Sequence, residues 1–172
     1  MFFRVRDLEL RRVHFAVEYY AGEINYLDDE IRQKDFLKAT GVAELLSNTL
    51  GEIRVKGHLS VSIEAPCDRC LEPAELGLDS DFDLFYRPVI RGHRHQEVEI
   101  DAGECEIAFY EGDGIALVDV LREFVVLNLP MQKLCRQDCK GICLMCGGNK
   151  NAAACSCRAA PADERWAGLR NW

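Results

Sequence analysis

The spacing of the cysteines constrains this chain more than any other feature. Six of the nine cysteines lie between Cys135 and Cys157, and two more, Cys67 and Cys70, form the short motif C-D-R-C. Thiolates at such separations can converge on one soft, tetrahedral metal ion, and pairs at this density are typical of structural zinc. The sequence therefore predicts a zinc-binding protein whose C-terminal segment takes its shape from the metal.

Length and composition frame this prediction. A chain of 172 residues that is 48% hydrophobic can bury one ordinary core and carry a small additional lobe. Its first residues carry charges of both signs and lack an apolar stretch typical of a secretory signal, and no run approaches bilayer length. We therefore expect a cytoplasmic protein with no membrane partner, in which clustered thiols stay reduced and bind metal more often than they form disulfides.

The charge distribution limits the kind of nucleic-acid binding to expect. The formal net charge is −8, which argues against a globally basic nucleic-acid binder. Residues 131–172 nevertheless carry seven basic and three acidic side chains, a net +4, so the remainder carries −12. A zinc ion held by four thiolates contributes about −2. A small basic face is compatible with these numbers, whereas a strong one is not.

Apolar residues that alternate with polar ones predict strands over residues 13–19, 53–65 and 76–86. The last two runs flank C-D-R-C, so we expect an antiparallel hairpin with Cys67 and Cys70 at its tip. Gly57 falls in the apolar register of its run and predicts a bulge or a bend. Two short strands are expected over residues 98–100 and 105–109, with Cys105, Ile107 and Phe109 facing the core.

From Leu117 the apolar period becomes helical. The face of this predicted helix comprises Leu117, Val120, Leu121, Phe124 and Leu127, and Pro130 ends it. A sheet with one apolar face needs a cover, so the fold class expected is α+β: an antiparallel β-sheet or meander covered by one C-terminal helix, with a Cys-rich zinc-binding tail. The predicted domains are residues 1–130 and a tail, 131–172, packed on the hairpin, with a last short helix through residues 163–169.

Two four-cysteine sites are the favoured arrangement of the metal ligands. Cys143 and Cys146 form a tight turn followed by two glycines, and Cys155 and Cys157 can complete a local site. Cys135 and Cys139 are then left for the hairpin pair, although Cys139 can replace either member of the local site. The predicted zinc ligands are Cys67, Cys70, Cys135, Cys139, Cys143, Cys146, Cys155 and Cys157.

Other chemistries fit the sequence less well. The C-x-x-C motif also serves thiol–disulfide exchange, but a reactive pair normally opens a helix, whereas the first pair here is expected at a hairpin tip. An iron–sulfur cluster would use the same ligands. His93 and His95 lie in an Arg-rich loop and are expected to be solvated. No constellation for nucleophilic catalysis, phosphate loop or small-molecule substrate site is evident, so an enzyme is not expected.

The combined motifs resemble the YceD family. The carrying features are C-x-R-C-L-x-P, an L-R-E helix ending in L-P at Pro130, then C-x-x-x-C-x-G-x-C-x-x-C-G-x-N with a trailing C-x-C, and a final D-x-R-W-x-x-L that includes Trp166. The resemblance covers most of the chain from Val61 to Trp172. It implies a role in ribosome assembly or rRNA maturation without a defined catalytic activity, because the family is linked to accumulation of the large-subunit rRNA in bacteria and plastids.

Cysteine pattern and resemblance together predict a non-enzymatic zinc-binding factor that supports 23S rRNA accumulation during ribosome biogenesis. Its expected partners are the large-subunit rRNA precursor or ribosomal proteins, and the candidate contacts are Arg69, Lys140, Lys150 and Arg158. These side chains can equally compensate the charge of anionic zinc centres. Two alternatives stay open: a protein–protein adaptor that docks on basic ribosomal proteins through the acidic β-rich part, and a thiol–disulfide oxidoreductase.

Overall fold

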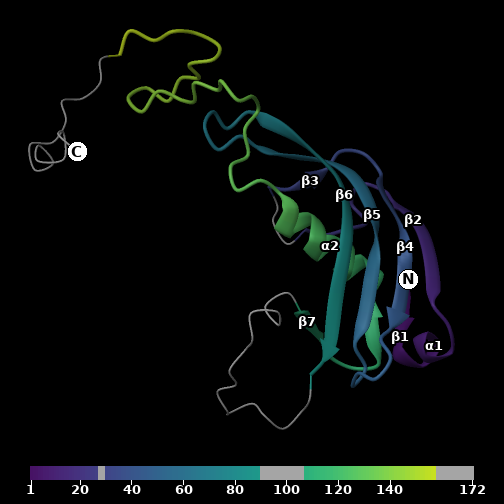
Figure 1. Ribbon diagram of the computed structural model, residues 1–172. Helices are drawn as coiled ribbons and strands as arrows, with labels where there is room; N and C mark the ends of the chain where they lie inside the picture. Colours follow the sequence, from purple (N-terminus) through teal and green to yellow (C-terminus); the bar gives the residue numbers. More distant parts are fainter. Residues whose placement is uncertain (27–29, 90–106, 158–172) are drawn as a thin grey trace, which may run out of the picture. The chain divides into compact units, whose positions relative to one another are not determined.

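The computed structural model describes residues 1–26, 30–89 and 107–157 (Figure 1). The chain divides into two compact units. Unit 1 comprises residues 1–65 and 75–131, and unit 2 comprises residues 66–74 and 132–172. Unit 2 therefore joins a short loop from the middle of the chain to the C-terminal segment. The domain boundary predicted after residue 130 stays a prediction.

The fold is α+β, which confirms the predicted class. The elements are β1 (Phe2–Arg4), α1 (Val5–Leu10), β2 (Val13–Tyr19), β3 (Arg32–Gln33), β4 (Leu37–Leu45), β5 (Ile53–Pro66), β6 (Pro73–Pro88), β7 (Ile107–Tyr110), β8 (Gly114–Ala116) and α2 (Leu117–Asn128). A six-stranded sheet has the order β2-β4-β5-β6-β7 with β3 beside β5, and β1 pairs with β8 in a second, two-stranded sheet. Within the described ranges, no helix is long and apolar enough to cross a membrane.

The predicted hairpin is present as the two long strands β5 and β6, which run side by side in Figure 1. Pairs of polar side chains across the strands fix their antiparallel register. Arg54 donates to Asp83 at 2.6 and 2.8 Å, and Ser62 donates to Glu75 at 3.1 Å. From the first pair to the second, the residue number rises by eight along β5 and falls by eight along β6. The strands are therefore antiparallel, and no residue is inserted between these contacts. The register places Cys67 at the start of the connecting loop.

The core lies between one face of the sheet and helix α2. The apolar register of β5 is buried as predicted, with Ile53, Val55, Leu59, Val61, Ile63 and Ala65 all at most 4% exposed. Helix α2 lies against this face, where the rings of Phe82 and Phe124 are 5.3 Å apart (Figure 1). The predicted helical face needs one correction. Leu127 is 75% exposed and Val125 is fully buried, because Leu127 lies at the edge of the apolar stripe in the last turn.

Gly57 does not form the predicted bulge. β4 and β5 pair without interruption from Lys38 opposite Ser60 to Leu45 opposite Ile53, so the ladder contains no extra residue. Gly57 lies opposite Gly41, and a Cβ at Gly57 would come 2.2 Å from the carbonyl oxygen of Thr40. The glycine pair therefore allows the two backbones to approach closely.

Strand β4 had no predicted counterpart, although it lies between β2 and β5. Its inward positions include Ala39, Gly41 and Ala43, which bury little apolar area and give a weak alternating pattern. β1, α1, β3 and β8 are short and were not predicted either.

The predicted inward register of the strand over 105–109 is wrong within its described part. Phe109 is 63% exposed and Tyr110 is buried, because β7 pairs in parallel with β6 and places Ala108 beside the buried Tyr86. Parallel pairing needs a long connection, and β6 and β7 are separated by residues 89–106 in the sequence. The predicted strand at 98–100, the buried Cys105, the histidines 93 and 95, and the helix at 163–169 lie outside the described residues.

The outward face of the hairpin provides a pH-dependent interaction. His58 lies with Nδ1 2.9 Å from Asp81 and Nε2 3.4 Å from Asp79. The hydrogen bond to Asp81 raises the pKa of His58 above its usual 6.5, against partial desolvation, and Asp79 adds to the increase. Protonated His58 therefore favours the folded state, a contribution fully present below pH 6.5 and lost as the pH rises through the folded-state pKa.

We expect an NMR titration to give a pKa for His58 above 6.5. Asp81→Asn should lower it, because the strongest partner of the imidazolium loses its charge. Asp113→Asn, which also removes one carboxylate but lies between β7 and β8, should leave the value unchanged. An unaltered His58 pKa in the Asp81 variant would contradict the role given to this carboxylate.

Candidate metal centres

The first cysteine pair lies on a tight turn between β5 and β6. The N–H of Leu71 donates to the carbonyl of Cys67 at 2.9 Å, and the N–H of Cys67 donates to the carbonyl of Glu72 at 2.8 Å. These bonds close the loop and leave Cys70 inside the turn. Leu71 adopts φ 65°, which costs a non-glycine residue about 1 to 2 kcal/mol. The turn therefore holds both thiols in place at some cost in backbone strain.

The second pair repeats the same backbone geometry. The N–H of Gly147 donates to the carbonyl of Cys143 at 2.8 Å, and the N–H of Cys143 donates to the carbonyl of Gly148 at 2.8 Å. Gly147 has φ 71° and takes the position that Leu71 has in the first turn. The two C-x-x-C segments are thus two copies of one turn, each presenting a pair of sulfurs.

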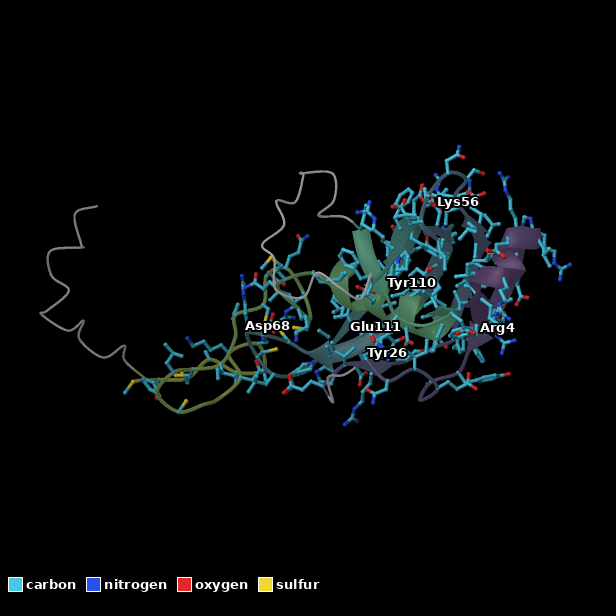
Figure 2. All side chains as sticks on the ribbon, turned by 90° about the horizontal axis from the view of Figure 1, so that it is seen from below. Arg4, Tyr26, Lys56, Asp68, Tyr110 and Glu111 are labelled. Carbon is cyan, nitrogen blue, oxygen red and sulfur yellow. The ribbon has the colours of Figure 1, made fainter. Side chains whose placement is uncertain are left out.

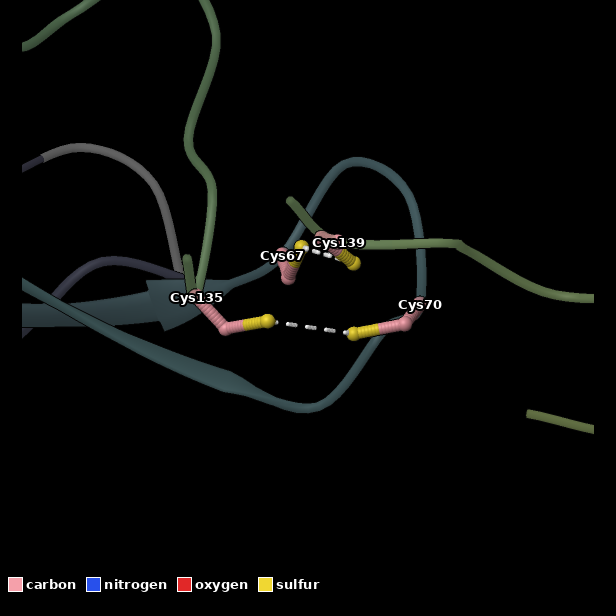
Figure 3. A group of neighbouring side chains, drawn as sticks. All are labelled: Cys67, Cys70, Cys135 and Cys139. Carbon is pink, nitrogen blue, oxygen red and sulfur yellow. Dashed lines mark hydrogen bonds between the residues drawn. The ribbon is translucent and has the colours of Figure 1, made fainter. Parts of the chain in front are cut away.

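Four sulfurs converge around the first turn (Figure 3). Cys67, Cys70, Cys135 and Cys139 have sulfur atoms within 4.8 Å of one another. The Sγ atoms of Cys67 and Cys139 are 3.8 Å apart, and those of Cys70 and Cys135 are 3.6 Å apart. Four sulfurs about 2.3 Å from one tetrahedral zinc ion would be about 3.8 Å apart, so this group has the dimensions of a single-ion site.

The second group contains Cys143, Cys146, Cys155 and Cys157, whose sulfur atoms also lie within 4.8 Å of one another. Cys143 is 5% exposed, whereas the other three members are exposed. Figure 2 shows the sulfur atoms of the Cys-rich segment in yellow. The structure therefore gathers the eight predicted cysteines into two groups of four, and Cys139 belongs to the group that contains the hairpin pair.

Backbone amides favour ionisation of Cys67 in the first group and of Cys143 in the second. Burial opposes ionisation of Cys67, but the N–H groups of Cys135, Arg69 and Cys70 outweigh it and lower its pKa to about 6. The N–H groups of Cys146 and Met145 lead the causes that lower the pKa of Cys143 to about 6. Amides directed at sulfur are the arrangement that stabilises thiolate ligands.

Other thiols in the groups are held in the protonated form by their neighbours. Burial, followed by the hydrogen bond with Cys70, raises the pKa of Cys135 to about 12. The hydrogen bond with Cys146, followed by burial, raises that of Cys157 to about 12. Four adjacent sulfurs cannot all ionise without a cation between them, and a bound divalent ion would remove this conflict.

The distances between the sulfurs in each group distinguish a single metal ion from an iron–sulfur cluster. In a four-iron cluster each cysteine binds a different iron, so the ligand sulfurs are spread around a body larger than one ion. All four sulfurs of each group lie within 4.8 Å, which fits one tetrahedral ion. Four thiolates and tetrahedral geometry are the donor set of zinc, or of a single iron.

Asn151 is a site residue that the sequence did not reveal. Its side-chain oxygen accepts from the guanidinium of Arg136 and the N–H of Lys140, both at 2.8 Å. Its Nδ2 donates to the sulfur of Cys139 at 3.3 Å and helps to lower the pKa of that thiol, although burial opposes the decrease. Asn151 lies between the two halves of the second cysteine group in sequence, so it connects the two groups. The segment K-N-A-A-A has no periodicity or motif that would have identified it.

Gly141 holds the C-terminal segment against the first turn. It has φ 70°, and a Cβ at this position would lie 2.9 Å from the carbonyl oxygen of Arg69. Next to it, the N–H of Ile142 donates to that same carbonyl at 2.9 Å. The guanidinium of Arg69 donates to the carbonyl of Cys139 at 3.1 Å. Arg69 therefore connects the first turn to the C-terminal segment through both its backbone and its side chain.

The other candidate contact residues are placed as follows. Lys140 and Lys150 are exposed, and within the described part of the chain neither ammonium group has a salt-bridge partner. Arg158 lies outside the described residues. The side chains of Lys140 and Lys150 are thus accessible to a partner, but their role stays a prediction.

Fold and site together define the class of protein: an α+β protein with two groups of four cysteines, each of which could hold a metal ion. The family model described as "Large ribosomal RNA subunit accumulation protein YceD" matches residues 55–171, which include all eight grouped cysteines. This chain belongs to the YceD family. The family description refers to large-subunit rRNA and mentions no enzymatic activity.

One curated relative is the Zea mays protein named "Large ribosomal RNA subunit accumulation protein YCED homolog 1, chloroplastic". It is 28% identical over 131 residues, an alignment that covers 63% of this chain and 45% of the relative. The chain thus spans less than half the length of that relative. No solved structure matches this chain.

Proposed function

We propose that this protein is a non-enzymatic zinc-binding factor that supports 23S rRNA accumulation during assembly of the large ribosomal subunit. The observation that carries the proposal is the family match over residues 55–171, which spans both cysteine groups. The residues that match the family model therefore include both candidate metal centres. Reduced thiol groups of this kind suit the cytoplasm, which is the proposed location.

A structural role for zinc follows from the donor sets. Each group supplies four thiols, which would fill the coordination sphere of the ion. A catalytic zinc site keeps one position open for water or substrate, whereas a structural site is closed. The proposed metal ions therefore organise unit 2 instead of activating a substrate.

The lysines at the cysteine groups are the proposed contacts with the rRNA precursor or with ribosomal proteins. Lys140 follows Cys139 directly, and Lys150 lies between the two pairs of the second group. The backbone at both positions is held, since the N–H of Lys140 donates to Asn151 and the N–H of Lys150 donates to the carbonyl of Gly141 at 2.9 Å. A bound metal would therefore present two exposed cations from an ordered backbone.

Charge reversal of both lysines tests this proposal. In cells depleted of the native protein and expressing Lys140→Glu/Lys150→Glu, we expect the fraction that co-sediments with large-subunit precursors to fall about threefold or more at physiological salt. The ratio of 23S to 16S rRNA should fall with it. Lys56→Glu is the matched control, because Lys56 is also exposed but lies on β5 in unit 1.

Three outcomes are informative. Unchanged co-sedimentation of the double variant would exclude the two lysines as contacts. Failure of the unaltered protein to associate with large-subunit precursors would overturn the proposed function. Association that survives nuclease treatment would assign the contact to ribosomal proteins, as an adaptor would require.

A further inference from the structure

A small pocket in unit 1 lies where helix α2 meets the two-stranded sheet and the end of β7. Its volume is about 320 Å³, and its lining comprises Phe2, Tyr86, Phe109, Tyr110, Glu111, Gly114, Ile115, Ala116, Asp119, Val120 and Glu123. Two of the lining residues, Tyr110 and Glu111, are labelled in Figure 2. The volume is near the lower limit for ligand pockets and suits one long side chain better than a cofactor.

Four aromatic rings form much of the lining. Phe109 is 63% exposed and Phe2 is 49% exposed, so both present ring surface to solvent. Tyr86 and Tyr110 are buried and fixed by their hydroxyls, which donate to Glu123 at 3.3 Å and to the carbonyl of Gly51 at 2.7 Å. The rings of Tyr86 and Tyr110 therefore belong to the core, and those of Phe2 and Phe109 are accessible to a ligand.

Three carboxylates also line the pocket, and among the described residues no basic side chain belongs to the lining. Asp119 is paired with Arg122 at 2.8 Å, and Glu123 accepts from the neutral hydroxyl of Tyr86. Within the described residues, the carboxylate of Glu111 has no ion-pair partner. The first turn of α2 contributes a positive partial charge of about half a unit, which is smaller than the charge left on Glu111 and Glu123.

From this arrangement we infer that the pocket binds a cationic side chain, lysine or arginine, of a basic protein partner. Aromatic faces attract cations through their negative quadrupole, and carboxylates at the rim add direct charge attraction. Shape alone would admit an apolar side chain, but the carboxylates would then lose solvation without gaining a partner. Phosphate would be repelled, so the site does not suit RNA.

This inference goes beyond the proposed function, because it concerns unit 1 and depends on neither metal nor RNA. A basic partner is also what the charge of the chain favours, since residues outside 131–172 carry a net −12. Overall charge would attract such a partner from a distance, whereas the pocket would select an extended cationic side chain.

Fluorescence anisotropy with a labelled peptide of alternating glycine, lysine and arginine tests the pocket in the full-length protein. We expect Glu111→Gln and Phe109→Ala each to weaken peptide binding about fivefold, because they remove one carboxylate and one aromatic face. Asp113→Asn is the matched control: it removes a carboxylate two residues from Glu111 that is not part of the lining. It should weaken binding by less than about twofold.

The outcomes separate a specific pocket from general electrostatics. Equal effects of Glu111→Gln and Asp113→Asn would overturn the inference, as would unaltered binding in Phe109→Ala. A second peptide with norleucine and citrulline in place of lysine and arginine should not bind measurably, and binding of similar strength would show an apolar site instead. Preferential binding of a labelled RNA oligonucleotide that Phe109→Ala abolishes would also refute it.

Discussion

Serine substitution of Cys67 and Cys70 is expected to remove one of two bound metal ions per chain and to unfold the first turn of unit 2. The pair supplies half of one four-sulfur group, and two remaining thiols do not complete a tetrahedral site. A structural zinc ion contributes roughly 10 kcal/mol or more to folding of a small domain, so this is the largest effect expected for any change in unit 2. Native mass spectrometry should count two ions in the unaltered protein and one in the variant.

Matched variants make this result specific. Cys143→Ser/Cys146→Ser should also retain one ion, since it removes half of the second group. Cys105→Ser should retain two, because eight other cysteines already supply four sulfurs to each group. Zinc binding predicts colourless protein, whereas four-thiolate iron would be coloured. Anaerobically isolated protein without bound metal would refute the metal-centred account of unit 2.

Replacement of Gly57 by alanine is expected to lower the free energy of unfolding of unit 1 by about 3 kcal/mol. A Cβ at Gly57 would lie 2.2 Å from the carbonyl oxygen of Thr40 and 2.9 Å from the Cα of Gly41. Both contacts are with backbone, which cannot rotate away as a side chain can, so β4 and β5 would have to separate. Denaturant unfolding measures the loss.

Gly77→Ala provides the control for this substitution. Gly77 lies in β6 of the same sheet, and a Cβ there would meet nothing within 4 Å. Its φ is not in the left-handed region, so alanine should be neutral or slightly stabilising because the unfolded chain loses entropy. Equal losses in the two variants would show that any side chain is harmful in this sheet, and would contradict the importance of the close approach at Gly57.

The sequence predicted the hairpin because apolar and polar residues alternate along most of both strands. β5 carries large aliphatic residues such as Ile53, Leu59 and Ile63 at every inward position except Gly57 and Ala65, so its pattern is strong. β4 has alanine and glycine at the same positions and gave little signal. Its place in the sheet depends on β2 and β5, which bury those small residues by pairing on both sides.

In the two cysteine groups, too, the features set by neighbouring residues could be predicted and those set by distant residues could not. Each C-x-x-C turn is fixed by neighbours in sequence, so the pairs could be predicted from spacing alone. Asn151 and Gly141 could not, because their contacts join segments whose proximity no periodic pattern encodes. The acidic aromatic pocket likewise collects Phe2, Phe109 and Glu123 from three separate elements.

The amino-acid sequence by itself determined the strands with strong alternation, the covering helix and the thiol pairs, because each depends on residues within one turn or one strand. Only the tertiary structure decided that Phe109 faces outward and that Gly57 provides space for a close backbone approach instead of a bulge. These features depend on which strand lies alongside and how close its backbone comes. Such information belongs to pairs of distant residues, and no single stretch of sequence contains it.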